Sequence, residues 1–83
     1  MKFNKYNDKD FNIIGKKLKE YREKANISQD TLSNKLALLG ITLYQVDIFK
    51  IEKNERTVRD FELWGICTVL NIKAEELFNP KET

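Results

Sequence analysis

Apolar residues recur at spacings of three and four along most of this 83-residue chain, a periodicity that favours a set of short amphipathic helices. Three of the runs are closed by Asn26, Gly40 and Asn71, residue types that tolerate the left-handed backbone at a helix end. The segment 41–46 is rich in β-forming residues, but one isolated strand would have no partner to pair with. The sequence therefore predicts an all-α fold.

The periodicity predicts five helices. They cover about residues 10–25, 28–39, 45–53, 60–70 and 73–78. Asp10 and Ser28 are expected to cap the first and the second of them, and Pro80 ends regular structure. The residues expected on the buried faces are Phe11, Ile14, Leu18, Tyr21, Ala25, Leu32, Leu36, Leu39, Ile48, Ile51, Leu63, Ile66, Cys67, Leu70, Ile72 and Leu77.

Length and composition restrict what the chain can hold. Its 83 residues fit one domain, for which we expect a flexible N-terminal arm (1–9), a helical domain (10–79) and a C-terminal tail (80–83). With no histidine and only Cys67 as a thiol, the common zinc-ligand sets are excluded, so we expect no metal and no cofactor. The polar N-terminus lacks a secretory signal and no apolar run is long enough to cross a bilayer. We therefore expect a soluble, cytoplasmic protein with no membrane partner and no small-molecule ligand.

The charge is unevenly distributed although the net charge is only +2. Residues 1–26 carry eight basic and four acidic side chains, whereas residues 59–83 carry three basic and five acidic ones. The two ends of the chain are thus expected to face different surroundings. Lysines such as Lys16, Lys17 and Lys19 are equally typical of the solvated side of a helix, so the charge does not by itself indicate nucleic acid.

Five fragments, in a fixed order, carry a resemblance to a known family. They are 14–23 (IGKKLKEYRE), 27–33 (ISQDTLS), 50–56 (KIEKNER), 60–63 (DFEL) and 70–78 (LNIKAEELF). From residue 14 to residue 78 the chain resembles the Cro/C1-type helix-turn-helix regulators, also called the xenobiotic-response-element-like family. The resemblance implies a compact, five-helix, lambda-repressor-like domain over 10–79. It also implies sequence-specific binding to double-stranded DNA by a transcriptional regulator, most simply a repressor.

The same resemblance assigns roles to single residues. The helix at about 45–53 would be the recognition helix in the major groove, with Gln45, Val46 and Lys50 at base-reading positions. Glutamine can pair with adenine, lysine can donate to guanine, and valine can pack on a thymine methyl group. Gln29 corresponds to a phosphate-binding glutamine at the start of the second helix. The other residues expected at the DNA backbone are Tyr44, Lys53, Asn54 and Arg56.

Three further expectations come from the resemblance and from the positions where this sequence differs from the family pattern. Arg22 and Glu52 match a structural pair in which the arginine of the first helix holds the glutamate that ends the recognition helix. Arg59 and Lys73 stand where the family often has a hydroxyl or acidic cap, so the last two helices start without the usual capping side chain. The stretch between the second and third helices is longer than the simplest turn, so the second helix is expected to extend through residues 37–39.

Three residues of the recognition helix have competing interpretations. Val46 fits packing against the second helix as well as it fits a base contact. Phe49 points away from the face that Ile48 and Ile51 define, and therefore into the groove, against the first helix, or toward a protein partner. Asp47 is unfavourable near phosphates unless it accepts from cytosine or lies to one side, and a solvated position is favoured.

The chain is not expected to be an enzyme, because it offers no histidine, one cysteine on an apolar stripe, and scattered carboxylates. The alternative is a helix-turn-helix fold used mainly for protein interaction, as in an antitoxin or a regulatory partner, with weak DNA binding. The low net charge, Phe49, and the aromatic residues of the acidic C-terminal part favour that alternative.

We also expect a homodimer, because one short recognition helix reads too few bases to select an operator. The expected dimer contacts are Phe61, Trp64 and Phe78, which lie off the buried stripe of the fourth helix or end the last one. Completion of a small core by these aromatics explains them nearly as well.

Overall fold

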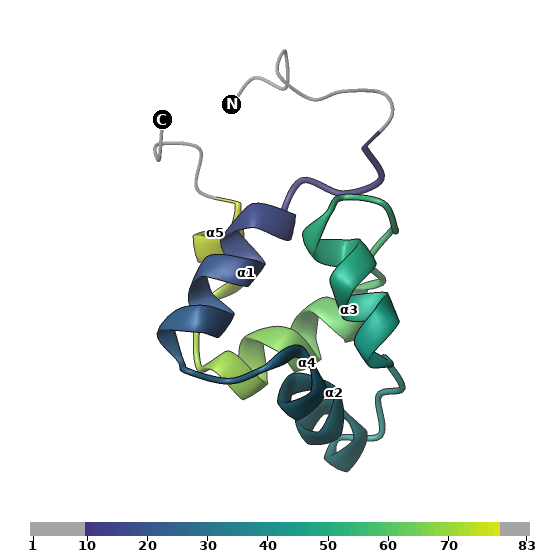
Figure 1. The fold of residues 1–83 in the computed structure, drawn as a ribbon. Coiled ribbons are helices and arrows are strands. Elements are labelled where there is room, and N and C mark those ends of the chain that lie inside the picture. The colour runs from purple at the N-terminus through teal and green to yellow at the C-terminus, as the bar shows by residue number, and fades with distance from the viewer. Residues whose placement is uncertain (1–9, 79–83) are drawn as a thin grey trace.

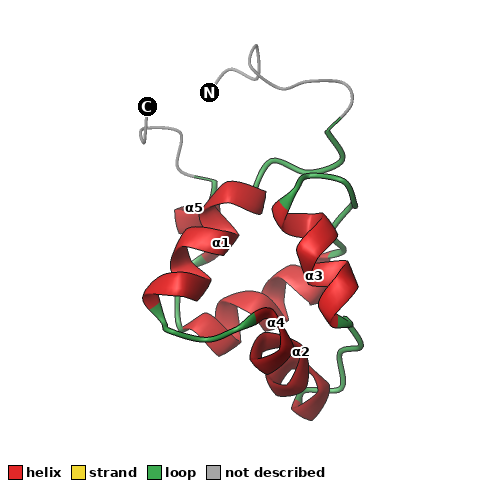
Figure 2. Cartoon of the chain, in the orientation of Figure 1, coloured by secondary structure: helices red, strands yellow, loops and turns green. Residues whose placement is uncertain are grey.

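The structure, a computed structural model, describes residues 10–78 as five helices joined by short connections (Figure 1). The helices are α1 (Gly15–Lys24), α2 (Gln29–Leu38), α3 (Gln45–Glu52), α4 (Asp60–Leu70) and α5 (Ala74–Leu77). Within this described range there is no strand, and in the 41–46 segment residues 41–44 form a loop while residues 45–46 begin α3 (Figure 2). The prediction of an all-helical domain is confirmed. The arm and tail expected at 1–9 and 80–83 lie outside the described residues.

The helices enclose one apolar core. α3 packs on α1 and α2, while α4 packs on α2 and α5. Side chains with no exposed surface come from four different helices; they are Leu18, Leu32, Leu36, Ile48, Ile51 and Ile66. Ile41 and Leu43, in the connection between α2 and α3, are also buried. Because this connection contributes core residues, the position of α3 relative to α2 is determined by packing as well as by chain length.

Residues with a left-handed backbone end three of the helices, as expected for Asn26, Gly40 and Asn71, whose φ angles are 64°, 81° and 56°. Asn54, after α3, adopts the same conformation with φ 62°. Ser28 caps α2 by accepting a hydrogen bond from the Thr31 backbone N–H at 3.0 Å.

The first helix begins later than predicted, at Gly15 instead of near Asp10. The Asn12 Oδ1 accepts from the Ile14 backbone N–H at 2.9 Å, and the Phe11 N–H donates to the Asn54 carbonyl at 2.9 Å. Residues 11–14 therefore run along the end of α3 and cannot form a helical turn. Phe11, expected in the core, is 58% exposed, and Ala25 is also exposed.

The second helix is shorter than predicted, because it ends at Leu38 and leaves Leu39 as its C-cap. Leu39 is 39% exposed, so its predicted place in the core is wrong. The Ile41 N–H donates to the Leu36 carbonyl at 3.0 Å, which turns the chain back and brings the Ile41 side chain into the core.

Acidic side chains at the third helical position cap the starts of α3, α4 and α5. Asp47 accepts from the Tyr44 N–H at 2.9 Å, Glu62 from the Arg59 N–H at 3.0 Å, and Glu76 from the Lys73 N–H at 3.2 Å. The side chains of Arg59 and Lys73 offer no acceptor, and the carboxylate three residues later supplies the other half of a capping box by accepting from their backbone N–H groups. α4 starts as predicted, α3 ends one residue earlier than predicted, and α5 is one residue shorter at each end.

Candidate nucleic-acid interface

Two consecutive helices, α2 and α3, form a helix-turn-helix unit. The Ser33 hydroxyl on α2 donates to the Leu43 carbonyl at 2.6 Å, which fastens the connection to the helix that precedes it. On α3, Ile48 and Ile51 are fully buried. The opposite face of α3 is exposed and consists of Gln45, Val46, Phe49, Lys50 and Lys53. Of the base-reading residues expected from sequence, all three therefore lie together on one exposed face.

Arg22 of α1 and Glu52 at the end of α3 form a buried ion pair. The Arg22 Nε donates to Glu52 Oε2 at 2.6 Å and its Nη2 donates to Oε1 at 3.2 Å. A third donor, Nη1, reaches the Ile27 carbonyl at 2.8 Å. Because the side chains of both partners are at most 10% exposed, this bidentate contact fixes the C-terminal end of α3 against α1 and the α1–α2 turn.

The hydrogen-bond chain continues from Glu52 to the starts of α2 and α3. Glu52 Oε1 accepts from the Gln29 Nε2 at 2.9 Å. With its nitrogen so occupied, Gln29 presents its Oε1, which accepts from the Gln45 Nε2 at 2.6 Å. The structure thus brings the predicted phosphate-binding glutamine and a predicted base-reading glutamine into direct contact, supported from behind by the Arg22–Glu52 pair.

A second ionic cluster joins the start of α3 to α4. Arg56 donates to both carboxylate oxygens of Glu62, at 2.9 and 3.2 Å, and its Nε lies 3.6 Å from Asp47 Oδ1. Burial opposes ionisation of Glu62, but the hydrogen bonds from Arg56 and from the Arg59 N–H hold its pKa below the usual 4.5. The guanidinium of Arg56, expected at the DNA backbone, is therefore engaged within the protein.

This cluster also explains Asp47. The carboxylate caps its own helix and faces Arg56, so it does not stand as a free anion on the exposed face of α3. Sequence reasoning did not single out Glu62. The signal was present in its position three residues after Arg59, the residue that precedes α4, where an acid supplies half of a capping box.

The C-terminal end of α3 lies close to the start of α1. The Asn54 Oδ1 accepts from the Gly15 N–H at 3.2 Å, and the Asn12 Nδ2 donates to the carbonyls of Ile51 and Arg56 at 3.1 and 2.8 Å. A Cβ atom on Gly15 would fall within 2.7 Å of the Glu52 carbonyl oxygen and still closer to Asn54 and Ile51. The side-chain oxygen of Asn54 is thus used inside the protein.

The other residues expected at the DNA backbone remain on the surface. Tyr44 precedes α3 and is exposed. The Lys53 Nζ lies 5.7 Å from the centroid of the Phe49 ring, within the range of a cation–π contact.

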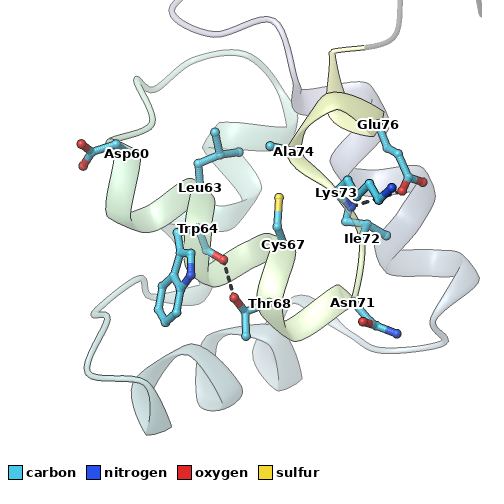
Figure 3. A pocket seen from close by; sticks show the side chains of 10 residues that line it. All are labelled: Asp60, Leu63, Trp64, Cys67, Thr68, Asn71, Ile72, Lys73, Ala74 and Glu76. Carbon is cyan, nitrogen blue, oxygen red and sulfur yellow. Dashed lines mark hydrogen bonds between the residues drawn. The ribbon is translucent and has the colours of Figure 1, made fainter.

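The aromatic residues expected at a dimer contact are exposed but do not line a single hollow. Trp64 lies on the rim of an open depression of about 660 Å³ between α4 and α5 (Figure 3). Phe78 lines a smaller depression of about 380 Å³ together with Phe11 and Val58, and Leu63 borders both depressions. Phe61 is half exposed and lines neither of these two.

Cys67 faces the depression between α4 and α5 from a largely buried position (Figure 3). Burial, with a smaller contribution from the Glu76 carboxylate, raises the pKa of its thiol, which is unlike an activated nucleophile. Between residues 10 and 78, no three acidic or thiol side chains are grouped closely enough to hold a metal ion. None of the five helices has the length and apolar character to span a bilayer, judged over the same residues.

Comparison with known proteins gives a match among solved structures. No family model and no curated protein sequence matches the chain. Among solved structures, the restriction-modification controller protein C.AhdI from Aeromonas hydrophila is 28% identical, with a TM-score of 0.69 over 78% of this chain and 87% of that one. Together with the order of the helices and the arrangement of α2 and α3, this similarity supports the resemblance to helix-turn-helix regulators of the Cro/C1 type that the sequence indicates.

Proposed function

We propose that this protein is a transcriptional regulator, acting as a repressor, that binds double-stranded DNA sequence-specifically with α3 in the major groove. The observation that carries the proposal is the composition of the exposed face of α3. It holds Gln45 and Lys50, whose ends can donate to bases, while both carboxylates of this helix, Asp47 and Glu52, are drawn into ion pairs with Arg56 and Arg22. A polyanion therefore meets no free acid from α3. The similarity to a restriction-modification controller protein supports a regulatory role.

Gln45, Val46 and Lys50 are the proposed base contacts. Gln45 is at the first position of α3, where residues of an inserted helix approach base edges, and Lys50 lies about one and a half turns further along. In the free protein the Gln45 nitrogen is held by Gln29. This contact restrains the glutamine before DNA binds, which reduces the entropy lost on binding.

Gln29, Tyr44, Lys53, Asn54 and Arg56 are the proposed contacts to the DNA backbone. Gln29 is at the first position of α2, where backbone N–H groups have no helical partner and favour a phosphate. Tyr44 and Lys53 are exposed at the two ends of α3. Asn54 has its amide nitrogen left to donate, whereas Arg56 would have to exchange part of its contact with Glu62 or Asp47 for a phosphate. Of these five residues, Arg56 is therefore expected to contribute least to binding of the DNA backbone.

We further propose a homodimer that pairs through the surface carrying Phe61, Trp64 and Phe78. Two of these residues border depressions whose walls share Leu63, so apolar surface extends from α4 toward the N-terminal segment. Pairing there would leave α3 free, and two-fold symmetry would place two recognition helices about 34 Å apart on one face of the duplex.

The second candidate function is a protein-interaction module with weak DNA binding. The exposed Trp64 and Phe61 favour it, since large exposed apolar side chains mark contact surfaces. The two candidates differ in their response to salt. Contacts to several phosphates make the logarithm of the binding constant fall linearly with the logarithm of salt concentration, with a slope of about −0.9 per phosphate.

Selection of duplexes from a random pool by the full-length protein tests the proposal. We expect enrichment of a palindromic sequence, followed by a steep salt dependence on the selected site. Recovery of no sequence above the unselected pool, with no measurable duplex binding at low salt, would reject DNA binding and leave the interaction module.

A further inference from the structure

Phe49 is a large apolar residue in the middle of the exposed face of α3, and the fold gives it no role in the core. It is 43% exposed, whereas its neighbours Ile48 and Ile51 are completely buried. Phe49 is not part of the buried apolar cluster that forms the core. Its ring centroid lies 5.7 Å from the ammonium group of Lys53, one helical turn further along the same face.

The side chains around Phe49 define what it can meet. Val46 is exposed three residues earlier, Gln45 four residues earlier and Lys53 four residues later, so helical geometry places them beside it. Val46 and Phe49 therefore form an apolar ridge between the polar end of Gln45 and the positive charge of Lys53. No acidic side chain of α3 interrupts this ridge, because Asp47 and Glu52 are held by Arg56 and Arg22.

We infer that Val46 and Phe49 read thymine, by packing on the 5-methyl groups that project into the major groove, and that Phe49 is a determinant of DNA specificity. This inference rests on the proposed function. A phenyl ring neither donates nor accepts hydrogen bonds at base edges, and the thymine methyl is the apolar group that the major groove presents. The positive charge of the flanking Lys53 suits the phosphates beside the groove, and the amide of Gln45 can hydrogen-bond to a neighbouring base.

The spacing of the ridge makes the inference specific. Val46 and Phe49 are three residues apart, which corresponds to about 4.5 Å along the helix axis, while successive base pairs rise by about 3.4 Å. The two side chains therefore contact thymines one or two base pairs apart within one half-site. The inference predicts a short, thymine-containing step near the centre of each half-site.

Deoxyuridine provides the direct test, since it lacks only the 5-methyl group and keeps the hydrogen-bonding edge of thymine. Each thymine of the selected half-site is replaced singly, and affinity is measured at constant salt. For the wild-type protein we expect about a fourfold loss at each of two thymines, the change that corresponds to one buried methyl group. Phe49→Ala should bind thymine and uracil equally at one of these positions, and Val46→Ala should do so at the other.

Leu38→Ala is the matched control, because Leu38 is 86% exposed, apolar, and located at the end of α2. It should keep the full sensitivity to both methyl groups. Thermal melting of Phe49→Ala should match that of the wild type, since the residue lies outside the core, so that a loss of binding is not a loss of fold.

Three outcomes would overturn the inference. Wild-type protein that binds the selected site equally well with uracil at every position would reject methyl reading while leaving the proposed function intact. Phe49→Ala with unchanged DNA affinity and unchanged methyl sensitivity would show that Phe49 does not read DNA. Absence of binding to any duplex would reject the proposed function and this inference together.

Discussion

Gln45 at the start of α3 donates a hydrogen bond to Gln29 at the start of α2, with 2.6 Å between the nitrogen and the oxygen. Each residue is the first of its helix. Since Gln29 is in turn held by Glu52, the two ends of α3 are connected through one side chain of α2. Gln29 therefore links the first and the last residue of the proposed recognition helix by hydrogen bonds.

Substitution of Gln45 by alanine should lower affinity for the selected site by about 1–3 kcal/mol and relax the preference at mainly one base pair, because a bidentate base contact is lost. Binding to a set of sites that differ by single base pairs measures both effects. A uniform loss at every site would contradict base reading by Gln45.

Substitution of Gln29 by alanine should weaken all duplexes to a similar extent, since a phosphate contact carries no sequence information. The double variant should lose less than the sum of the single losses, by about 0.5–3 kcal/mol, because the two side chains are in contact. Additive losses would show that the hydrogen bond is absent in the complex. A changed preferred sequence in the Gln29 variant would contradict its assignment to the backbone.

Substitution of Arg22 by alanine should destabilise the fold by about 3–5 kcal/mol, because Glu52 would be left as a buried charge without its partner. Urea unfolding measures the loss, and DNA binding should fall with it as α3 loses its anchor on α1. Glu20→Ala is the control, since the half-exposed Glu20 on α1 pairs with Lys17 at 3.7 Å, and the loss of this contact should cost at most about 1 kcal/mol. Equal effects of the two substitutions would contradict the structural role of Arg22.

Glu62 gives the protein a stability that depends on pH. Its pKa is lowered in the folded state, so its contribution is present above the ordinary pKa of 4.5 and is lost as the pH falls through the lower folded value. Glu62→Gln should cost about 1–3 kcal/mol at neutral pH, because a charge-assisted contact with Arg56 is weakened. Unfolding in urea at several pH values should show the two proteins converging below pH 4.5. Parallel curves would contradict the ion pair.

Substitution of Gly15 by alanine should destabilise the protein by about 1–3 kcal/mol, as an added methyl group overpacks the junction with the α3 carbonyls. Alanine at Gly40 is the comparison, because a Cβ atom there meets no neighbour and any cost comes from its φ of 81°. Only the Gly15 variant should also impair DNA binding, since it displaces the end of α3. A stable Gly15→Ala protein with normal binding would show that the junction can relax.

Substitution of Trp64 by alanine should weaken the proposed homodimer without unfolding the monomer, because the side chain is 56% exposed. Sedimentation of the free protein, and of the protein with a palindromic site, measures the association. A wild-type monomer in both experiments, with one molecule per duplex, would reject the dimer.

Local sequence signals determined most of the helical framework. Periodicity identified α2, α3 and α4 and the burial of Ile48 and Ile51, and the residues that tolerate a left-handed backbone marked the ends at Asn26, Gly40 and Asn71. These features could be predicted because a helical face and a helix stop depend on residues within a few positions of each other.

Tertiary packing decided the rest. Residues 11–14 have a helical apolar pattern, yet they bond to the end of α3 and delay the start of α1 to Gly15. Ile41 enters the core in place of Leu39 because the chain turns back on α2. Asp47 proved to be a cap and an ion-pair partner of Arg56, which in turn is held by Glu62. Each of these outcomes depends on how separate elements approach one another, and a one-dimensional pattern contains no distance between them.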